Sequence, residues 1–159
     1  GWTDEQGHYR VRWIPQTEVR GVAYDTPIAG YRVGTCNTLR LWKAEATESF
    51  DFEAFNQSDY DRAVEDKVAS ETISKVLYPS DSVESGRELR LLQEYFLVAC
   101  ALRDILRSFE RQNYDIRQMP EKAAIQLNDT HPALSVAELM RLLVDEYRLM
   151  LDPILLGSG

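Results

Sequence analysis

The chain has 159 residues, of which 44% are hydrophobic and 28% charged. This length and composition predict one ordinary globular domain with a core and exclude a disordered tail. The formal net charge of −8, from 18 basic and 26 acidic residues, argues against binding nucleic acid or anionic membranes by bulk electrostatics, although a few local cations suffice to hold one phosphate.

Two cysteines, Cys36 and Cys100, lie far apart and belong to no paired motif. Cys100 lies in the apolar stripe of a predicted helix, which indicates a reduced core residue. The polar, acidic N-terminus does not resemble a signal peptide, and no apolar run approaches the roughly 18 residues of a membrane span. We therefore expect a cytoplasmic protein.

The first part of the chain alternates between apolar and polar residues. Residues 8–24 predict two short strands separated at Pro15, and the turn-forming residues 25–27 are expected to end the second. Residues 37–46 alternate again and predict a further strand.

The hydrophobic period becomes helical from residue 58. Two consecutive helices with Ser58 and Ser70 as N-caps are predicted before Pro79. A polar surface loop over residues 79–86 is expected next. Residues 87–112 carry a broad apolar stripe and predict a long, buried helix.

Residues 123–132 concentrate the polar chemistry of the chain. A short buried strand is expected over residues 123–127, and it would deliver Asn128, Asp129, Thr130 and His131 to its carboxyl end. Such an arrangement presents side chains to a crevice in α/β enzymes.

A last helix is predicted after this turn. Ser135 and Glu138 have the spacing of a capping box, and the helical pattern continues to about Arg148. Residues 151–159 lose the helical period and end in Gly-Ser-Gly, so we expect them to be a truncation or a linker end.

Familiar catalytic motifs are absent from the sequence. There is no glycine-rich phosphate loop and no Gly-x-Ser-x-Gly, and Asp129 with His131 would supply only two ligands, so no metal site is expected. From the residues alone, His131 is either a structural residue of the turn or a ligand contact. Asp81, between two serines, is most simply a turn residue.

Five segments together resemble the glycogen (α-glucan) phosphorylase family. They are residues 24–31 (YDTPIAGY), 37–42 (NTLRLW), 76–79 (VLYP), 87–96 (RELRLLQEYF) and 125–132 (IQLNDTHP), and they follow the family's order at nearly its spacing. The resemblance implies an internal fragment of the N-terminal domain of a bacterial-type enzyme.

This resemblance implies an α/β fold in which residues 1–159 form a single partial domain. It would be part of the N-terminal Rossmann-like domain of a GT-B glycosyltransferase, with short strands followed mainly by helices. The implied activity of the full enzyme is phosphorolysis of α-1,4-glucan ends to glucose 1-phosphate, with inorganic phosphate and pyridoxal phosphate. The parent is expected to be a homodimer.

The family's cofactor lysine and phosphate-holding residues belong to a downstream segment. The resemblance therefore implies no catalytic and no cofactor-binding residue in this chain, and we expect the fragment alone to be inactive. It does imply a gate over the crevice at residues 80–85, which would exclude water on closing. The predicted gate and sugar-pocket residues are Asp81, Ser82, Arg90, Asp129 and His131.

The sequence departs from the family pattern in two places. Ser80 and Ser82 stand where asparagines usually flank the gate aspartate, and Val83 replaces an aromatic residue, which suggests weaker gating or altered ligand contacts. Arg107 is followed by Ser108, where animal enzymes have two arginines for the nucleotide activator. This favours an enzyme without AMP control.

The alternative hypothesis is a non-catalytic helical module that binds a ligand or oligomerises on the same scaffold. Apolar residues near the C-terminus predict self-association of the fragment. A cofactor-lysine segment downstream in the parent reading frame would decide for the enzyme.

Overall fold

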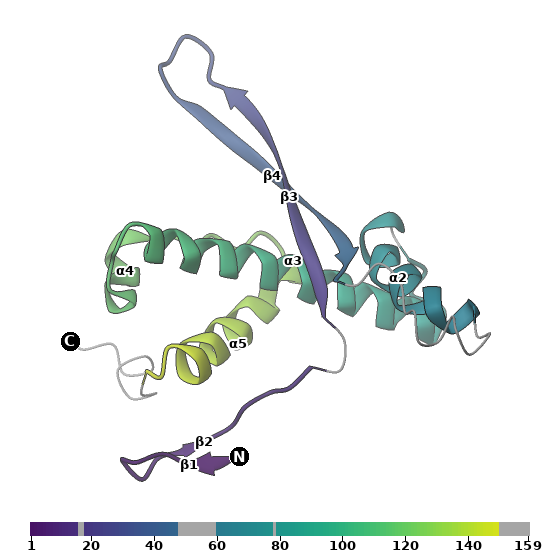
Figure 1. The fold of residues 1–159 in the computed structure, drawn as a ribbon. Helices are drawn as coiled ribbons and strands as arrows, with labels where there is room; N and C mark the ends of the chain where they lie inside the picture. Colours follow the sequence, from purple (N-terminus) through teal and green to yellow (C-terminus); the bar gives the residue numbers. More distant parts are fainter. Residues whose placement is uncertain (16–17, 48–59, 78, 150–159) are drawn as a thin grey trace. The chain divides into compact units, whose positions relative to one another are not determined.

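The structure is a computed structural model that describes residues 1–15, 18–47, 60–77 and 79–149. The chain divides into two compact units, which we describe separately. The middle unit is Gln16–Leu97, and the terminal unit combines Gly1–Pro15 with Val98–Gly159. Strands precede helices along the chain, as predicted, and the architecture is mixed α and β (Figure 1).

A long two-stranded ribbon opens the middle unit (Figure 1). Strand β3 (Val19–Ala29) pairs antiparallel with β4 (Cys36–Ala46), from Val19 opposite Ala46 to Ala29 opposite Cys36. The strand predicted over residues 37–46 is confirmed. The predicted end at residues 25–27 is wrong, because each strand of a ribbon has a free edge on which Pro27 is tolerated.

The two faces of this ribbon differ in chemistry. Tyr24 lies opposite Leu41, and the apolar residues of that face, Tyr24, Ile28, Leu39 and Leu41, are 47% to 59% exposed. On the other face, Arg40 donates to both carboxylate oxygens of Asp25 at 2.6 Å. The ribbon therefore leaves a row of apolar side chains uncovered.

Helix α2 (Tyr60–Lys75) packs against β4. Ala44 is fully buried there, and its N–H donates to the Ser74 hydroxyl at 3.0 Å. Ser70 is buried inside this single helix, so its predicted role as the N-cap of a second helix is wrong; no Gly or Pro interrupts the segment. Ser58 lies outside the described residues.

Helix α3 (Glu84–Arg111) is the predicted long helix and has 28 residues. It begins three residues earlier than predicted, with the carboxylate of Glu84 in the first turn, where it interacts favourably with the helix dipole. Farther along, the Gln93 amide donates to the carbonyls of Ile73 at 3.0 Å and Val76 at 2.7 Å. These bonds satisfy acceptors that the end of α2 would otherwise leave open.

The core of the terminal unit forms around the second half of α3. Val98, Leu102, Leu106 and Phe109 recur every three or four residues and are at most 7% exposed, so they form one face of the helix. The other buried members of this cluster are Met119 and Leu142. The chain after α3 forms single turns and short helices. They are η1 (Ile116–Gln118), α4 (Met119–Lys122), η2 (His131–Ala133), α5 (Leu134–Arg141) and the π-helical turn η3 (Leu142–Glu146).

The buried strand predicted over residues 123–127 is absent. This segment has no strand pairing, and Ile125 and Leu127 are 42% and 41% exposed. An extended segment becomes a strand only when a neighbouring strand accepts its backbone hydrogen bonds, and the described residues supply none there.

The predicted capping box is also wrong. Helix α5 begins at Leu134, and Ser135 lies within it at 8% exposure. Glu138 accepts from Arg141 Nε at 2.7 Å and Nη2 at 2.8 Å, so its carboxylate bonds forward along the helix. The turn η2 already leads the chain into α5, and the helix needs no side-chain cap at Ser135.

A small N-terminal hairpin pairs β1 (Trp2–Thr3) with β2 (Tyr9–Arg10). The carboxylate of Asp4 accepts from Arg10 Nε at 2.8 Å and from the backbone N–H of His8 at 2.8 Å. The bond from Arg10 is the main reason that the pKa of Asp4 falls to about 2. The alternating pattern continues beyond β2, but residues 11–14 form no strand and are exposed.

No helix within the described residues has the length and apolar character needed to cross a bilayer.

Cys100 is a free thiol, and its side chain is half-buried rather than part of the core. This burial raises its pKa to about 11. The terminal residues 151–159, expected to be a truncation or linker end, lie outside the described residues.

Leu106→Ala is expected to destabilise the 159-residue chain by about 2–5 kcal/mol, because it leaves a cavity beside Leu102 and Leu142. The matched control is Val136→Ala, since Val136 is 58% exposed on α5 and its truncation should change stability by less than about 0.5 kcal/mol. Urea unfolding followed by circular dichroism measures both. Equal losses in the two variants would contradict this assignment of the core.

Candidate functional site

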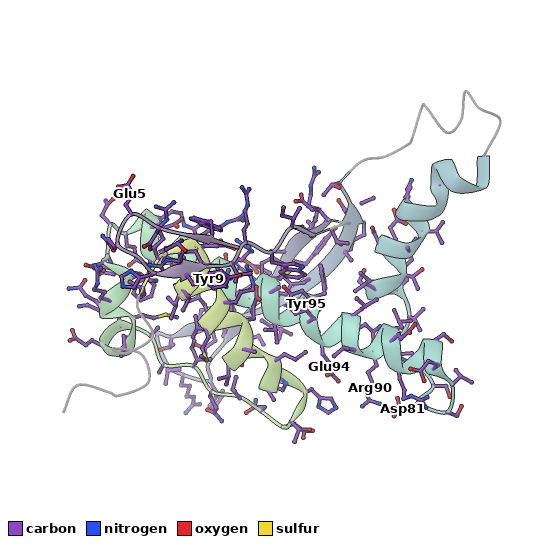
Figure 2. All side chains as sticks on the ribbon, turned by 90° about the horizontal axis from the view of Figure 1, so that it is seen from below. Glu5, Tyr9, Asp81, Arg90, Glu94 and Tyr95 are labelled. Carbon is purple, nitrogen blue, oxygen red and sulfur yellow. The ribbon has the colours of Figure 1, made fainter. Side chains whose placement is uncertain are left out.

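The first group of predicted site residues lies where the loop after α2 meets α3. Arg90 Nη1 donates to Asp81 Oδ1 at 2.8 Å and to Oδ2 at 2.6 Å. Figure 2 shows the two side chains together at the N-terminal end of the helix. The pairing with Asp81 raises the pKa of Arg90 above its usual value. Asp81 and Arg90, both predicted to belong to the gate, are therefore direct partners.

The two serines beside Asp81 bond to each other. Their hydroxyl oxygens are 2.7 Å apart, and the backbone N–H of Ser82 donates to Ser80 Oγ at 3.4 Å. Val83 is exposed. Ser82, one of the predicted gate residues, thus already has a hydroxyl partner inside its own loop.

The second group of predicted site residues forms the turn before η2. The Asp129 backbone is left-handed, with φ of 67°, a conformation that is uncommon outside glycine and is tolerated best by Asp and Asn. Asp129 Oδ1 accepts from the backbone N–H of Thr130 at 2.7 Å, and Oδ2 lies 3.4 Å from His131 Nδ1. The Asp129 carboxylate thereby joins the two residues that follow it.

This turn keeps its polar groups in solvent. Side-chain exposure is 66% for Asp129 and 48% for His131. The hydrogen bond from the Thr130 amide, followed by the charge of His131, lowers the pKa of Asp129, so the carboxylate is ionised at neutral pH. An exposed carboxylate, an imidazole and a hydroxyl provide the mixture of acceptors and donors that sugar hydroxyls need.

The structure brings together Asp81 with Arg90, and Asp129 with His131. The first pair belongs to the middle unit and the second to the terminal unit. The sequence left two interpretations of this turn open, a structural role and a contact with a ligand, and the geometry is compatible with both. Asp129 does bond the turn backbone, and the imidazole of His131 is nevertheless half exposed.

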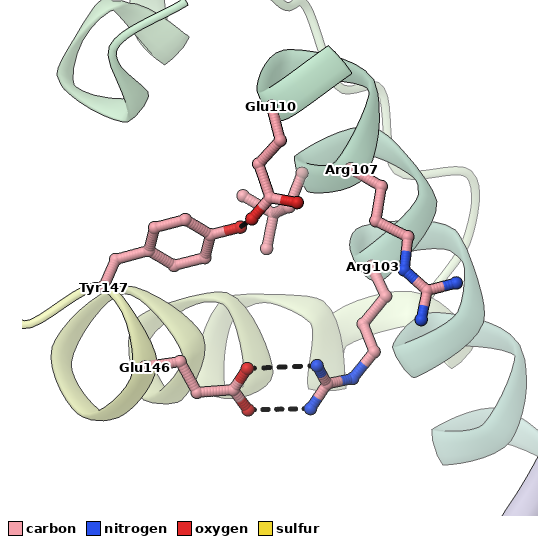
Figure 3. A pocket seen from close by; sticks show the side chains of 6 residues that line it. Arg103, Arg107, Glu110, Glu146 and Tyr147 are labelled. Atoms are coloured by element: carbon pink, nitrogen blue, oxygen red, sulfur yellow. Dashed lines mark hydrogen bonds and ion pairs between the residues drawn. The ribbon is translucent and has the colours of Figure 1, made fainter. Parts of the chain in front are cut away.

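A cavity of about 320 Å³ lies in the terminal unit between α3 and η3 (Figure 3). Its lining is Arg103, Leu106, Arg107, Glu110, Glu146 and Tyr147. Arg103 donates to both carboxylate oxygens of Glu146, at 3.0 and 2.7 Å, and the Tyr147 hydroxyl donates to Glu110 at 2.7 Å. Burial, followed by this bond to Glu110, raises the pKa of Tyr147 to about 12.

Among these lining residues, the sequence pointed only to Arg107 as a residue that could contact a ligand. The signal for Arg103 and Glu110 was available, because residues 103, 107 and 110 have the spacing of one helix face. The partners Glu146 and Tyr147 could not be found in this way, since they follow from tertiary packing.

The lysines do not form a cofactor site. The chain has four, Lys43, Lys67, Lys75 and Lys122, and the structure places all four at the surface. Lys43 pairs with Glu45 and Lys75 with Glu71, and none lines the cavity. The described residues therefore do not fit a pyridoxal phosphate that needs a lysine in an enclosed pocket.

Comparison with known proteins extends over nearly the whole chain. A family model described as "Carbohydrate phosphorylase" matches residues 2–154. A glycogen phosphorylase of Synechocystis sp. is 57% identical over 146 residues, which are 92% of this chain and 17% of that protein. A glycogen phosphorylase of Chlamydia trachomatis is 45% identical over 94% of this chain and 18% of its own length.

An animal protein matches as well. The brain form of human glycogen phosphorylase is 50% identical over 85% of this chain and 17% of its own length. The chain thus spans less than a fifth of the relatives it matches. With the family model covering residues 2–154, the chain belongs to the carbohydrate phosphorylase family.

Proposed function

We propose that this chain is part of an α-glucan phosphorylase, which releases glucose 1-phosphate from α-1,4-glucan ends with inorganic phosphate. The observation that carries the proposal is the exposed turn at Asp129, Thr130 and His131, in a chain whose relatives are named glycogen phosphorylases. In this proposal the chain belongs to the N-terminal Rossmann-like domain of a GT-B enzyme, in which residues 1–159 form a single partial domain.

The polar turn is one wall of the sugar pocket in this proposal. The left-handed backbone at Asp129 supports it, because unusual backbone conformations concentrate at binding and catalytic sites. The ionised Asp129 carboxylate accepts hydrogen bonds from sugar hydroxyls, and the His131 imidazole adds a donor or an acceptor. Asp81, Ser82 and Arg90 act at the gate.

Pyridoxal phosphate binds elsewhere in the full enzyme, which is consistent with four surface lysines in this chain. When bound, it supplies the phosphate group for acid–base chemistry, and this chain positions sugar and gate.

The parent is a cytoplasmic homodimer in this proposal. The fragment self-associates through exposed apolar residues such as those of the ribbon; a monomer in light scattering at high concentration would contradict that.

The parent enzyme is not activated by AMP in this proposal. Ser108 cannot supply the charge of a second arginine beside Arg107. The cavity around Arg107 also contains two carboxylates, from Glu110 and Glu146, and Glu146 already pairs with Arg103. A nucleotide phosphate therefore meets little net positive charge.

The full-length protein, with pyridoxal phosphate, glycogen and inorganic phosphate, is expected to form glucose 1-phosphate. Residues 1–159 alone should form none, because no described lysine lies in a pocket that could hold the cofactor. A coupled assay for glucose 1-phosphate measures both. Turnover by the fragment, or a full-length protein that binds glucan without turnover, would overturn the proposal.

Asp129→Asn in the full-length enzyme is expected to lower kcat/KM for glucan about tenfold or more, since a charged acceptor of the sugar is lost. Asp115→Asn is the matched control. Like Asp129, Asp115 accepts from a nearby backbone N–H, in its case that of Arg117 at 2.9 Å, and this bond lowers its pKa. Steady-state kinetics should show a loss confined to Asp129; equal losses would identify a purely structural turn.

AMP at saturating concentration is expected to change the initial rate of phosphorolysis by less than about twofold, because the two carboxylates of the cavity offset the charge of its two arginines and a phosphate binds there weakly. The positive control is an animal phosphorylase that AMP activates, assayed under the same conditions. Clear activation of the enzyme containing this chain would show that Arg107 suffices without a second arginine.

A further inference from the structure

The N-terminal hairpin contains a buried polar atom that has no role in the candidate site. His8 Nδ1 is buried, yet it has no hydrogen-bond partner. Buried polar atoms in this state are rare in folded proteins, and each one calls for a physical reason. The His8 side chain as a whole is 39% exposed. The imidazole can therefore exchange a proton with water while the hairpin stays closed.

The charged group beside this nitrogen is the carboxylate of Asp4. His8 Nδ1 lies 3.5 Å from Asp4 Oδ1, and the two atoms form an ion pair only when the imidazole is protonated. The same oxygen accepts from the backbone N–H of Gln6 at 3.1 Å and of His8 at 2.8 Å. The backbone N–H of Asp4 in turn donates to the His8 carbonyl at 2.9 Å. Asp4 thus closes the turn, and the imidazole nitrogen faces its carboxylate.

The charge of Asp4 is fixed at neutral pH, whereas that of a histidine is not. Arg10 Nε donates to Asp4 Oδ2 at 2.8 Å, and this bond is the main reason that the pKa of Asp4 is about 2. Asp4 is therefore ionised and Arg10 protonated between about pH 5 and pH 8, the range in which an ordinary imidazole titrates. Glu5, the acidic residue that follows Asp4, is exposed. Within this cluster, the change of charge over that range comes from His8.

We propose that His8 is a pH-dependent clamp on the N-terminal hairpin, because protonation turns its contact with Asp4 Oδ1 into an ion pair that stabilises the turn. The hairpin keeps one arrangement, and the proton changes its stability. The stabilisation is present while the imidazole is charged and is lost as the pH rises through its titration range. Arg10 repels the imidazolium, but it bonds the other carboxylate oxygen. This inference does not depend on the proposed glucan activity.

The test is hydrogen exchange of the backbone amides of residues 2–10 in the full-length protein, at about pH 5.5 and about pH 7.5. Dividing each rate by that of the same segment unfolded in denaturant removes the intrinsic effect of pH. Protection in the wild type should be about two- to fivefold greater at the lower pH, the range for one exposed ion pair. His8→Gln should remove this difference and keep the protection of the wild type at the higher pH, because glutamine is polar but uncharged.

His131→Gln is the matched control. His131 is the other histidine of the chain, and it also lies beside a carboxylate, with Nδ1 3.4 Å from Asp129 Oδ2. Its replacement should leave the pH dependence of the hairpin amides unchanged. Raising salt from about 0.05 to about 0.5 M should reduce the difference between the two pH values in the wild type and have no such effect in His8→Gln.

Arg10→Gln gives a second, independent variant. It removes the permanent partner of Asp4, so protection should fall at both pH values. The difference between them should persist or grow, because the imidazolium no longer meets the repulsion of Arg10. Equal protection of the wild type at both pH values would overturn the inference. So would a pH difference that survives in His8→Gln, or protection that increases as the pH rises.

Discussion

The apolar face of helix α3 is the constraint on which the core of the terminal unit depends. Its residues from Val98 onward bury one face in the terminal unit, and its first half receives the end of α2 through Gln93. The apolar stripe that makes a 28-residue helix stable therefore contributes to two units.

Side chains at the start of this helix hold the loop that carries Asp81. Arg87, Arg90 and Glu94 are spaced by three and four residues, so they lie along one side of the helix start. The loop bearing Asp81 is held there by main-chain contacts with Arg87 and by the side chain of Arg90. The Asp129 turn instead depends on local bonds and a left-handed residue. The loop is thus held by side chains of α3, and the turn by bonds among its own residues.

Patterns of hydrophobic residues predicted the long helix and the strand over residues 37–46, since both have a period that burial enforces. Sequence patterns gave wrong predictions where the same local motif is compatible with two structures. Ser135 and Glu138 match a capping box, yet the turn at His131 had already led the chain into the helix. The apolar residues Ile125 and Leu127 resemble a strand, yet no neighbouring strand pairs with them. Family resemblance selected the site residues; periodicity could not.

The sequence by itself determined the family, the long helix, and the identity of the polar residues at the loop and the turn. Tertiary structure decided their partners: that Arg90 bonds Asp81, and that Glu146 bonds Arg103. The physical reason is that helical and strand periods follow from burial of nearby residues, which any stretch of sequence records. A side chain's partner depends on which segments the fold brings within about 3 Å, and no local pattern records that distance.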